Sequence, residues 1–154
     1  MKTKEDLQAE IRYAIRLCER TARLYRRVQA VSMFLAIVGG SAAVATVVGE
    51  LPRLLTGTGA VLFALFGAAL IVIRPTDKAA QNESDVRKYQ ALLAKSVRMS
   101  DQELVEALEE TRQGDAPEIE PLRDVAYNDV ARELGRPDAV VALTPLQRAL
   151  AALA

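Results

Sequence analysis

The stretch AIVGGSAAVATVVGELPRLLTGTGAV, residues 36–61, decides the fold of this chain. It belongs to two runs without any charged residue, 28–49 and 54–73, which only the sequence ELPR at 50–53 separates. A hydrocarbon core about 30 Å thick is crossed by about 20 helical residues. The pattern therefore predicts two membrane-spanning helices joined by an external turn at 50–53.

Two other interpretations of these runs are less favoured. A buried hairpin in a water-soluble bundle would rarely need adjacent charge-free runs of this length. A cleaved signal peptide has a shorter apolar region, whereas here the first run begins only after the charged residues 1–27.

The distribution of charge predicts how the crossings are oriented. The net charge is +4 over residues 1–27, +3 over 74–99 and −7 over 100–154, although the whole chain is neutral. Because basic residues beside membrane-spanning helices stay in the cytoplasm, we expect both termini to be cytoplasmic. Three arginines are then expected at the level of the lipid headgroups: Arg26, Arg27 and Arg74.

Residues 1–27 are predicted to form a cytoplasmic amphipathic helix that continues into the first crossing. The segment has no Pro or Gly, and its apolar residues recur at alternating spacings of 4 and 3. Such a seam packs either on later helices of the same chain or on the same helix of a neighbouring copy. The residues of this predicted oligomer or bundle seam are Leu7, Ile11, Ala14, Cys18 and Tyr25.

Residues 74–154 are predicted to form cytoplasmic helices. Pro75 predicts a kink or break, and a helix is expected over 79–97. The sequence SDQE at 100–103 is a capping box that begins a helix ending near Arg112. Since no strand alternation occurs, the fold class is all-α: a two-transmembrane hairpin with a cytoplasmic helical bundle, formed by the N-terminal helix and the C-terminal helices.

Two more helices are expected after a loop that contains Gly114. One begins near Pro121 and ends at Gly135, and the other begins with Thr144 as its N-cap and Pro145 in its first turn. Apolar faces are expected for the helices at 79–97 and 121–135: Val86, Tyr89, Leu93 and Val97 on the first, and Leu122, Val125, Ala126, Val130 and Leu134 on the second.

The residue types present argue against an enzyme. The chain has no His and a single Cys, so Cys–His and Ser–His–Asp catalysis within this chain are excluded. No zinc-ligand spacing and no glycine-rich phosphate loop with its lysine occur. We expect no cofactor and no metal, and the scarcity of aromatic residues argues against nucleic-acid binding.

Small and weakly polar residues gather on one side of each predicted crossing, within an arc of about 120°. They are Gln29, Ser32, Ala36, Gly39, Gly40, Ala43 and Thr46 on the first, and Thr56, Gly57, Ala60, Ala64, Gly67 and Ala68 on the second. Lipid gives helices no hydrophobic drive to associate, so small residues usually mark where they meet. We expect this stripe to pack within the hairpin or between subunits; the alternative is that part of it lines a water pathway. Larger residues are expected to face lipid: Leu55, Leu62, Phe63, Phe66 and Ile73.

The order of elements resembles the SLATT family of bacterial two-transmembrane proteins. The segment RYAIRLCERTARLYRRVQ, at 12–29, resembles the basic amphipathic helix that precedes the family's hairpin, and PEIEPLRDVAYNDVARELG, at 117–135, resembles its C-terminal segment. The resemblance implies a membrane effector of antiphage conflict systems, which forms pores or disrupts the membrane when a separate sensor or trigger protein is activated.

The expected function is therefore an oligomeric effector that forms a pore or perturbs the membrane, gated through its cytoplasmic helices. Membrane lipid, further copies of this chain and a separate trigger protein are the expected partners. Two alternatives stay open: a non-conducting anchor or scaffold that recruits a cytoplasmic partner, and a phage holin-like protein. A holin usually has a shorter cytoplasmic part than the residues that follow Ile73 here.

Overall fold

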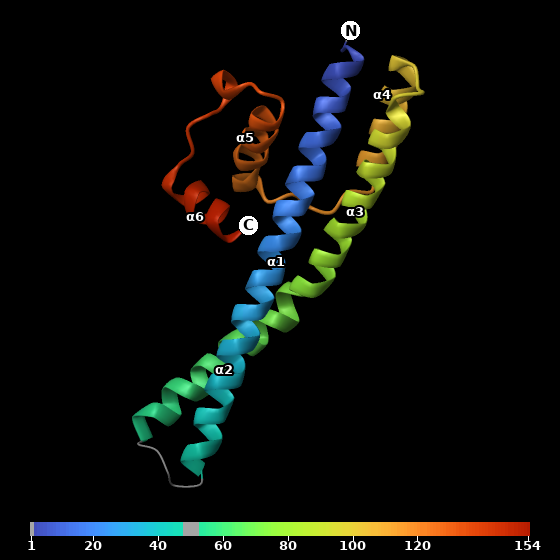
Figure 1. The fold of residues 1–154 in the computed structure, drawn as a ribbon. Coiled ribbons are helices and arrows are strands. Elements are labelled where there is room, and N and C mark those ends of the chain that lie inside the picture. Colours follow the sequence, from blue (N-terminus) through green and yellow to red (C-terminus); the bar gives the residue numbers. More distant parts are fainter. Residues whose placement is uncertain (1, 48–52) are drawn as a thin grey trace. The chain divides into compact units, whose positions relative to one another are not determined.

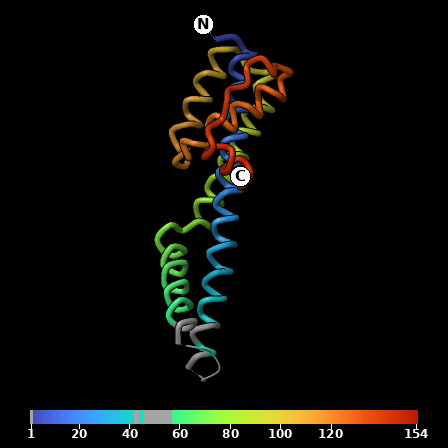
Figure 2. Tube along the Cα trace, turned by 90° about the vertical axis from the view of Figure 1, so that its left-hand side faces the viewer, coloured from blue at the N-terminus to red at the C-terminus, as the bar shows by residue number. Residues whose placement is uncertain are grey.

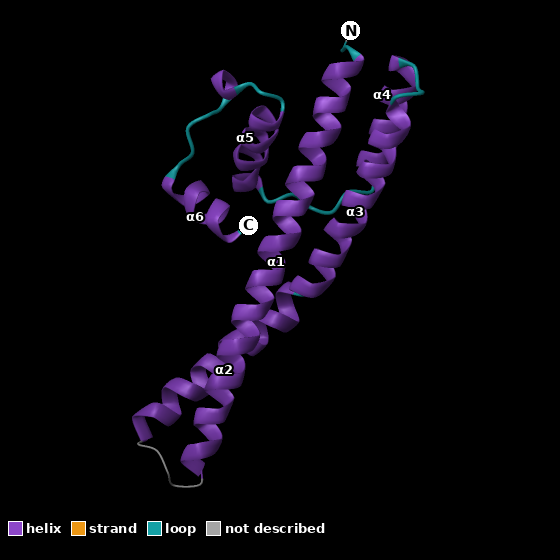
Figure 3. Ribbon diagram, viewed as in Figure 1, coloured by secondary structure: helices purple, strands orange, loops and turns teal. Residues whose placement is uncertain are grey.

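Every regular element in a computed structural model of the chain is a helix, within the residues that the structure describes, 2–47 and 53–154 (Figure 3). The side chains at 42–43, 46–47 and 53–56 are also outside the description. The predicted all-α class is confirmed for the described part of the chain.

The described residues form six α-helices and two short 3-10 helices in succession (Figure 1). They are α1 Lys4–Val47, α2 Arg53–Ile73, α3 Pro75–Ser96, α4 Asp101–Arg112, η1 Glu120–Leu122, α5 Arg123–Glu133, η2 Pro137–Ala139 and α6 Pro145–Leu153. The chain divides into two compact units, which are described separately below. The bundle unit comprises Met1–Leu24 with Lys78–Ala154, and the hairpin unit comprises Tyr25–Asp77.

Helix α1 runs without interruption from Lys4 to Val47, so the predicted continuity of the N-terminal helix with the first apolar run is confirmed over these residues. The predicted break at Pro75 is also present. Arg74 has a φ of 50°, outside the helical region, and α3 begins at Pro75. Helix α3 starts earlier than the predicted 79, because Pro lacks the N–H that the first helical turn leaves unused.

The core of the bundle unit joins α1, α3 and α4. Its buried residues are Leu7, Ile11, Ile15, Tyr89, Leu92, Leu104 and Leu108, with Ala14, Cys18, Val86 and Leu93 packed against them. The predicted seam of α1 is therefore covered by helices of its own chain, except Tyr25, which belongs to the hairpin unit. Val97 does not belong to this core: it follows the last residue of α3 and is exposed.

Both predicted helix starts in the C-terminal part are capped by side chains. The Ser100 hydroxyl accepts from the Glu103 N–H while the Glu103 carboxylate accepts from the Ser100 N–H, and Thr144 with Gln147 repeats this arrangement at α6. Helix α5 ends as expected, since Gly135 has a φ of +68°, which suits a glycine after a helix.

The apolar face of α5 is buried as predicted at Leu122, Val125, Ala126 and Val130. Leu134 was expected to belong to it, and that expectation is wrong, because the residue lies beyond the last turn and is exposed. On α6, Leu146 and Leu153 are exposed as well.

Candidate functional site

In the hairpin unit, α1 and α2 touch backbone to backbone at Gly39. A Cβ atom at this position would lie 2.5 Å from the Gly59 carbonyl oxygen and 2.8 Å from the Phe63 amide nitrogen. A Cβ atom at Gly40 would lie 3.1 Å from the Phe63 ring. Figures 1 and 2 both show α1 and α2 next to each other in the hairpin unit. Only a residue without a side chain permits this approach.

The small residues of α1 lie largely on the side that meets α2. Ser32, Ala36 and Gly39 are buried, whereas Gly40 and Gln29 are half-buried. The remaining two members of this predicted stripe, Ala43 and Thr46, lie outside the described side chains.

The small residues of α2 lie elsewhere, on a side away from α1. Gly57, Ala60, Ala64 and Ala68 are exposed, and a Cβ atom at Gly57 or Gly67 would meet no other atom within 4 Å. Thr56 is outside the described side chains. We call these five described residues, 57, 60, 64, 67 and 68, the small-residue face of α2.

The residues of α2 that meet α1 are instead Gly59, Leu62 and Phe63. Leu62 and Phe63 were expected on the lipid face: Phe63 is 55 % exposed, but both residues also lie against the glycines of α1. The physical reason is complementarity: two adjacent glycines on α1 leave a shallow groove, and a large ring fills it better than a second small residue would. Of the other residues expected to face lipid, Ile73 is exposed, Phe66 is half-buried and Leu55 lies outside the described side chains.

Large apolar side chains cover the outside of the hairpin unit. Those exposed are Val31, Met33, Phe34, Ile37, Val38, Val44, Val61, Phe63, Leu65, Ile71, Val72 and Ile73. Among the described residues one stretch, 57–96, contains a segment long and apolar enough to cross a membrane, and only 6 % of that segment is buried. The first apolar run, 28–49, includes residues outside the description, and its crossing stays a prediction.

The three arginines expected at the lipid headgroups are all exposed and flank the apolar runs. Arg26 and Arg27 precede the first run on α1. Arg74 follows the second run and forms an ion pair with Asp77, 2.5 Å from guanidinium nitrogen to carboxylate oxygen. Whether they contact lipid stays a prediction.

In the bundle unit, ion pairs join α1 to α5. The guanidinium groups of Arg12 and Arg16 lie 2.8 and 2.9 Å from the Glu133 carboxylate. One turn further along α1, Arg20 lies 2.8 Å from the carboxylate of Asp129. Hydrogen bonds from Arg16 and Arg12 hold the pKa of Glu133 below its ordinary value against a smaller effect of burial. The basic side of α1 is thus used in part to hold α5.

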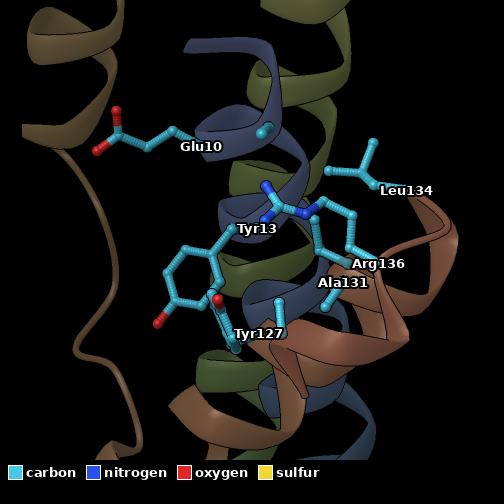
Figure 4. A pocket seen from close by; sticks show the side chains of 9 residues that line it. Glu10, Tyr13, Tyr127, Ala131, Leu134 and Arg136 are labelled. Carbon is cyan, nitrogen blue, oxygen red and sulfur yellow. The ribbon is translucent and has the colours of Figure 1, made fainter. Parts of the chain in front are cut away.

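An apolar cleft of about 290 Å³ is lined by α1, α5 and the segment that follows α5 (Figure 4). Tyr13 of α1 and Tyr127 of α5 lie next to each other at its wall, and Leu134 and Arg136 complete its far side. Burial is the main cause that raises the pKa of the Tyr13 hydroxyl. The sequence analysis did not single out any of these four residues as lining a site.

Two buried polar side chains of the bundle unit were also missed. The Asn128 amide donates to the Val141 carbonyl oxygen at 2.9 Å and accepts from the Val141 N–H at 2.8 Å, which ties the segment before α6 to α5. Asp85 is 1 % exposed and accepts from the Ala116 N–H at 3.0 Å. A polar residue on an otherwise apolar helix side is the signal that could have indicated both.

Comparison with known proteins adds no relative: no family model matches the chain, and neither a curated protein nor a solved structure does. The described residues contain no group of three carboxylate, thiol or imidazole side chains that could hold a metal ion. The most extensive surface feature of the hairpin unit, among the described residues, is its exposed apolar side chains.

Proposed function

We propose that the hairpin unit crosses a bacterial inner membrane twice, with both termini in the cytoplasm. The observation that carries this proposal is the apolar outer surface, on which Ile71 and Val72 are 77 % and 78 % exposed. Contiguous apolar surface of this extent is unfavourable in water and favourable in lipid. The absence of charged residues from 28–49 and 54–73, and the net positive charge beside each run, support the same arrangement.

The small-residue face of α2 is the proposed contact between copies of the chain. The contact within the hairpin already uses Gly39, Gly40 and Gly59, whereas Ala60 and Ala64 face outward. In lipid, a face of Gly and Ala allows the backbones of two helices to approach closely, and van der Waals packing then drives association. Two helices per subunit cannot enclose a pore, so a conducting state requires such an oligomer.

The function we propose is that of a membrane effector of the SLATT type, which forms a pore or perturbs the membrane in antiphage defence. Packing between copies would change when the bundle unit responds to a separate trigger protein. The charge-free runs support an assembly that does not select ions by charged groups within the membrane.

The test is a pair of enlarging substitutions on the small-residue face, Ala60→Leu and Ala64→Leu. Both should abolish membrane depolarisation upon expression and weaken crosslinking between copies, because added side chains keep the helices apart. Leu65→Phe is the matched control, since Leu65 is exposed on another side of α2. Depolarisation that persists in both alanine variants would contradict the proposed contact.

A non-conducting scaffold is the second candidate, and the apolar cleft of the bundle unit favours it. The cleft has two tyrosines at its wall, and aromatic residues in a pocket commonly anchor a protein partner. This alternative predicts no ion flux from liposomes that contain the chain, and a cytoplasmic partner that is lost with Tyr127→Ala.

A further inference from the structure

The apolar cleft of the bundle unit has the size of a site for a small molecule. Its volume of about 290 Å³ is close to the lower end of the range of ligand pockets, about 300–1,000 Å³. Every residue that lines it belongs to the bundle unit. A ligand of this cleft is therefore small, of about one ring with a short side arm.

The wall of the cleft is buried in part and open to solvent in part. Val130 and Ala131 are 5 % and 7 % exposed, whereas Tyr127 and Leu134 are 43 % and 46 % exposed. A ligand can thus reach the Tyr127 ring and the Leu134 side chain directly from solvent. Covering them removes apolar surface from water, which favours binding.

Two aromatic rings lie next to each other on this wall, Tyr13 of α1 and Tyr127 of α5 (Figure 4). Aromatic rings pack against one another offset or edge to face, and such pairs add to the effect of burial alone. An aromatic ligand therefore gains more here than an aliphatic ligand of equal apolar area.

The two charged side chains of the cleft differ in how they are balanced. The Glu10 carboxylate lies 2.9 Å from Lys2 and 2.8 Å from Arg112, so two cations already balance it. Arg136 has a single ion pair among the described residues, with Asp138, and its length of 3.9 Å makes it loose. The Arg136 side chain is 68 % exposed, so its N–H groups are available to a ligand.

The cleft thus combines aromatic and apolar surface with one available cation. A guanidinium group binds a carboxylate through two parallel N–H···O bonds, which are stronger than bonds between neutral groups. We propose that the apolar cleft binds a small aromatic carboxylate. The ring of the ligand packs against Tyr13 and Tyr127, and its carboxylate accepts hydrogen bonds from the Arg136 guanidinium. Because the cleft lies wholly in the bundle unit, the proposal does not depend on the proposed membrane function.

Calorimetric titration of the full chain in detergent micelles tests the proposal with three probes. They are 3-phenylpropionate, 3-phenylpropanamide and 3-phenylpropylammonium, which share one ring and differ in the charge of the end group. We expect saturable binding of the carboxylate, binding of the amide that is about tenfold weaker or less, and no binding of the ammonium. The aliphatic analogue, 3-cyclohexylpropionate, should bind several-fold more weakly than 3-phenylpropionate.

Substitutions then assign the two halves of the ligand to their residues. Arg136→Gln should weaken binding of 3-phenylpropionate about tenfold, because it removes the charge-assisted hydrogen bonds. Arg148→Gln is the matched control, since Arg148 is also exposed but does not line the cleft. Asp138→Asn should strengthen binding, because it removes the carboxylate that competes for Arg136. Tyr127→Ala should weaken binding several-fold, whereas Tyr127→Phe keeps the ring and should leave it unchanged.

These substitutions change exposed side chains, so the bundle unit should stay folded, and thermal unfolding without ligand checks that it does. Three results would each overturn the proposal: no saturable binding of 3-phenylpropionate, equal binding of the amide, or unchanged affinity in a folded Arg136→Gln chain. Equal binding of the amide would show that the cleft is a purely apolar anchor, as the scaffold alternative requires.

Discussion

At the scale of single residues, Gly39 sets how closely α1 and α2 approach. Gly39→Ala places a methyl group where the Gly59 carbonyl and the Phe63 amide now lie, and backbone atoms cannot move aside independently. We expect the free energy of unfolding of the hairpin unit to fall by about 1–3 kcal/mol, which is typical of overpacking. Chemical unfolding in micelles, followed by circular dichroism, measures the change.

Gly67→Ala is the matched control for that substitution, since a Cβ atom there meets nothing within 4 Å. It should leave the unfolding transition unchanged or raise it slightly, because Ala favours helix over Gly. Equal losses in both variants would contradict a specific role for Gly39 in the contact with α2.

Asn128 is predicted to be a stability residue of the bundle unit. Asn128→Ala removes both of its hydrogen bonds to Val141 and leaves two backbone groups without a partner. The expected loss is about 1–3 kcal/mol in the free energy of unfolding, measured by urea denaturation in micelles. Gln102→Ala, which removes an exposed hydrogen bond to Glu106, should change it far less.

Cys18 is predicted to be unreactive while the bundle unit is folded. Burial raises the pKa of its thiol to about 12, so at pH 8 the thiolate fraction is about 10⁻⁴. Alkylation by iodoacetamide should be slow at pH 8 and should still accelerate between pH 10 and 12. A rate that levels off near pH 9 would show an ordinary, accessible thiol.

How much the sequence predicts at this scale depends on the kind of residue. The role of Gly39 follows from its place among small residues in an apolar run. The role of Phe63 does not follow, because helical periodicity says which residues share a side but not which side meets the partner. The burial of Asp85 does not follow either, because its partner, the Ala116 N–H, lies 31 positions further along the chain.

At the scale of elements, the sequence predicts where a helix starts better than it predicts which residues near the helix end belong to the apolar face. Capping residues act within one turn, so Ser100 and Thr144 indicate the starts of α4 and α6 directly. Val97 and Leu134 continue an apolar spacing, but each lies past the end of its helix, where that spacing no longer applies. The ion pairs between α1 and α5 link residues more than a hundred positions apart and leave no local signal.

The attachment of α5 to α1 should depend on pH through Glu133. Its pKa is lowered in the folded chain, so its stabilising effect is complete above the unfolded value near 4.5 and is lost as the pH falls through the lower folded value. Since these groups are partly exposed, we expect the ion pairs of Glu133 to contribute less than about 1 kcal/mol to the free energy of unfolding. Hydrogen exchange of α5 amides should be faster in Glu133→Gln than in the unsubstituted chain at pH 7.

The difference between the two chains should shrink as the pH falls below about 4.5 and as salt is added. Glu109→Gln is the control, because its ion pair lies within α4 and should not affect α5. A difference that persists unchanged in 1 M salt would assign the effect of Glu133 to packing rather than to charge.

At the scale of the whole molecule, the net charge is zero, but the basic and the acidic residues are concentrated in different parts of the chain. The basic residues lie beside the apolar runs, and the acidic residues lie in the C-terminal segment. The helical class and the position of the apolar runs follow from the sequence, because charge-free length is a local property. The pairing of the helices within the bundle unit does not, since several apolar faces could have matched the seam of α1.

The central claim is that the hairpin unit crosses a membrane twice, and thiol labelling in intact cells tests it most directly. In a Cys18→Ala background, Glu50→Cys, Ala80→Cys and Leu146→Cys are exposed one at a time to a maleimide that does not cross membranes. The account predicts that Glu50→Cys is labelled in intact cells and that the other two are labelled only after the cells are permeabilised. Labelling of Glu50→Cys and Ala80→Cys from the same side of the membrane would contradict it.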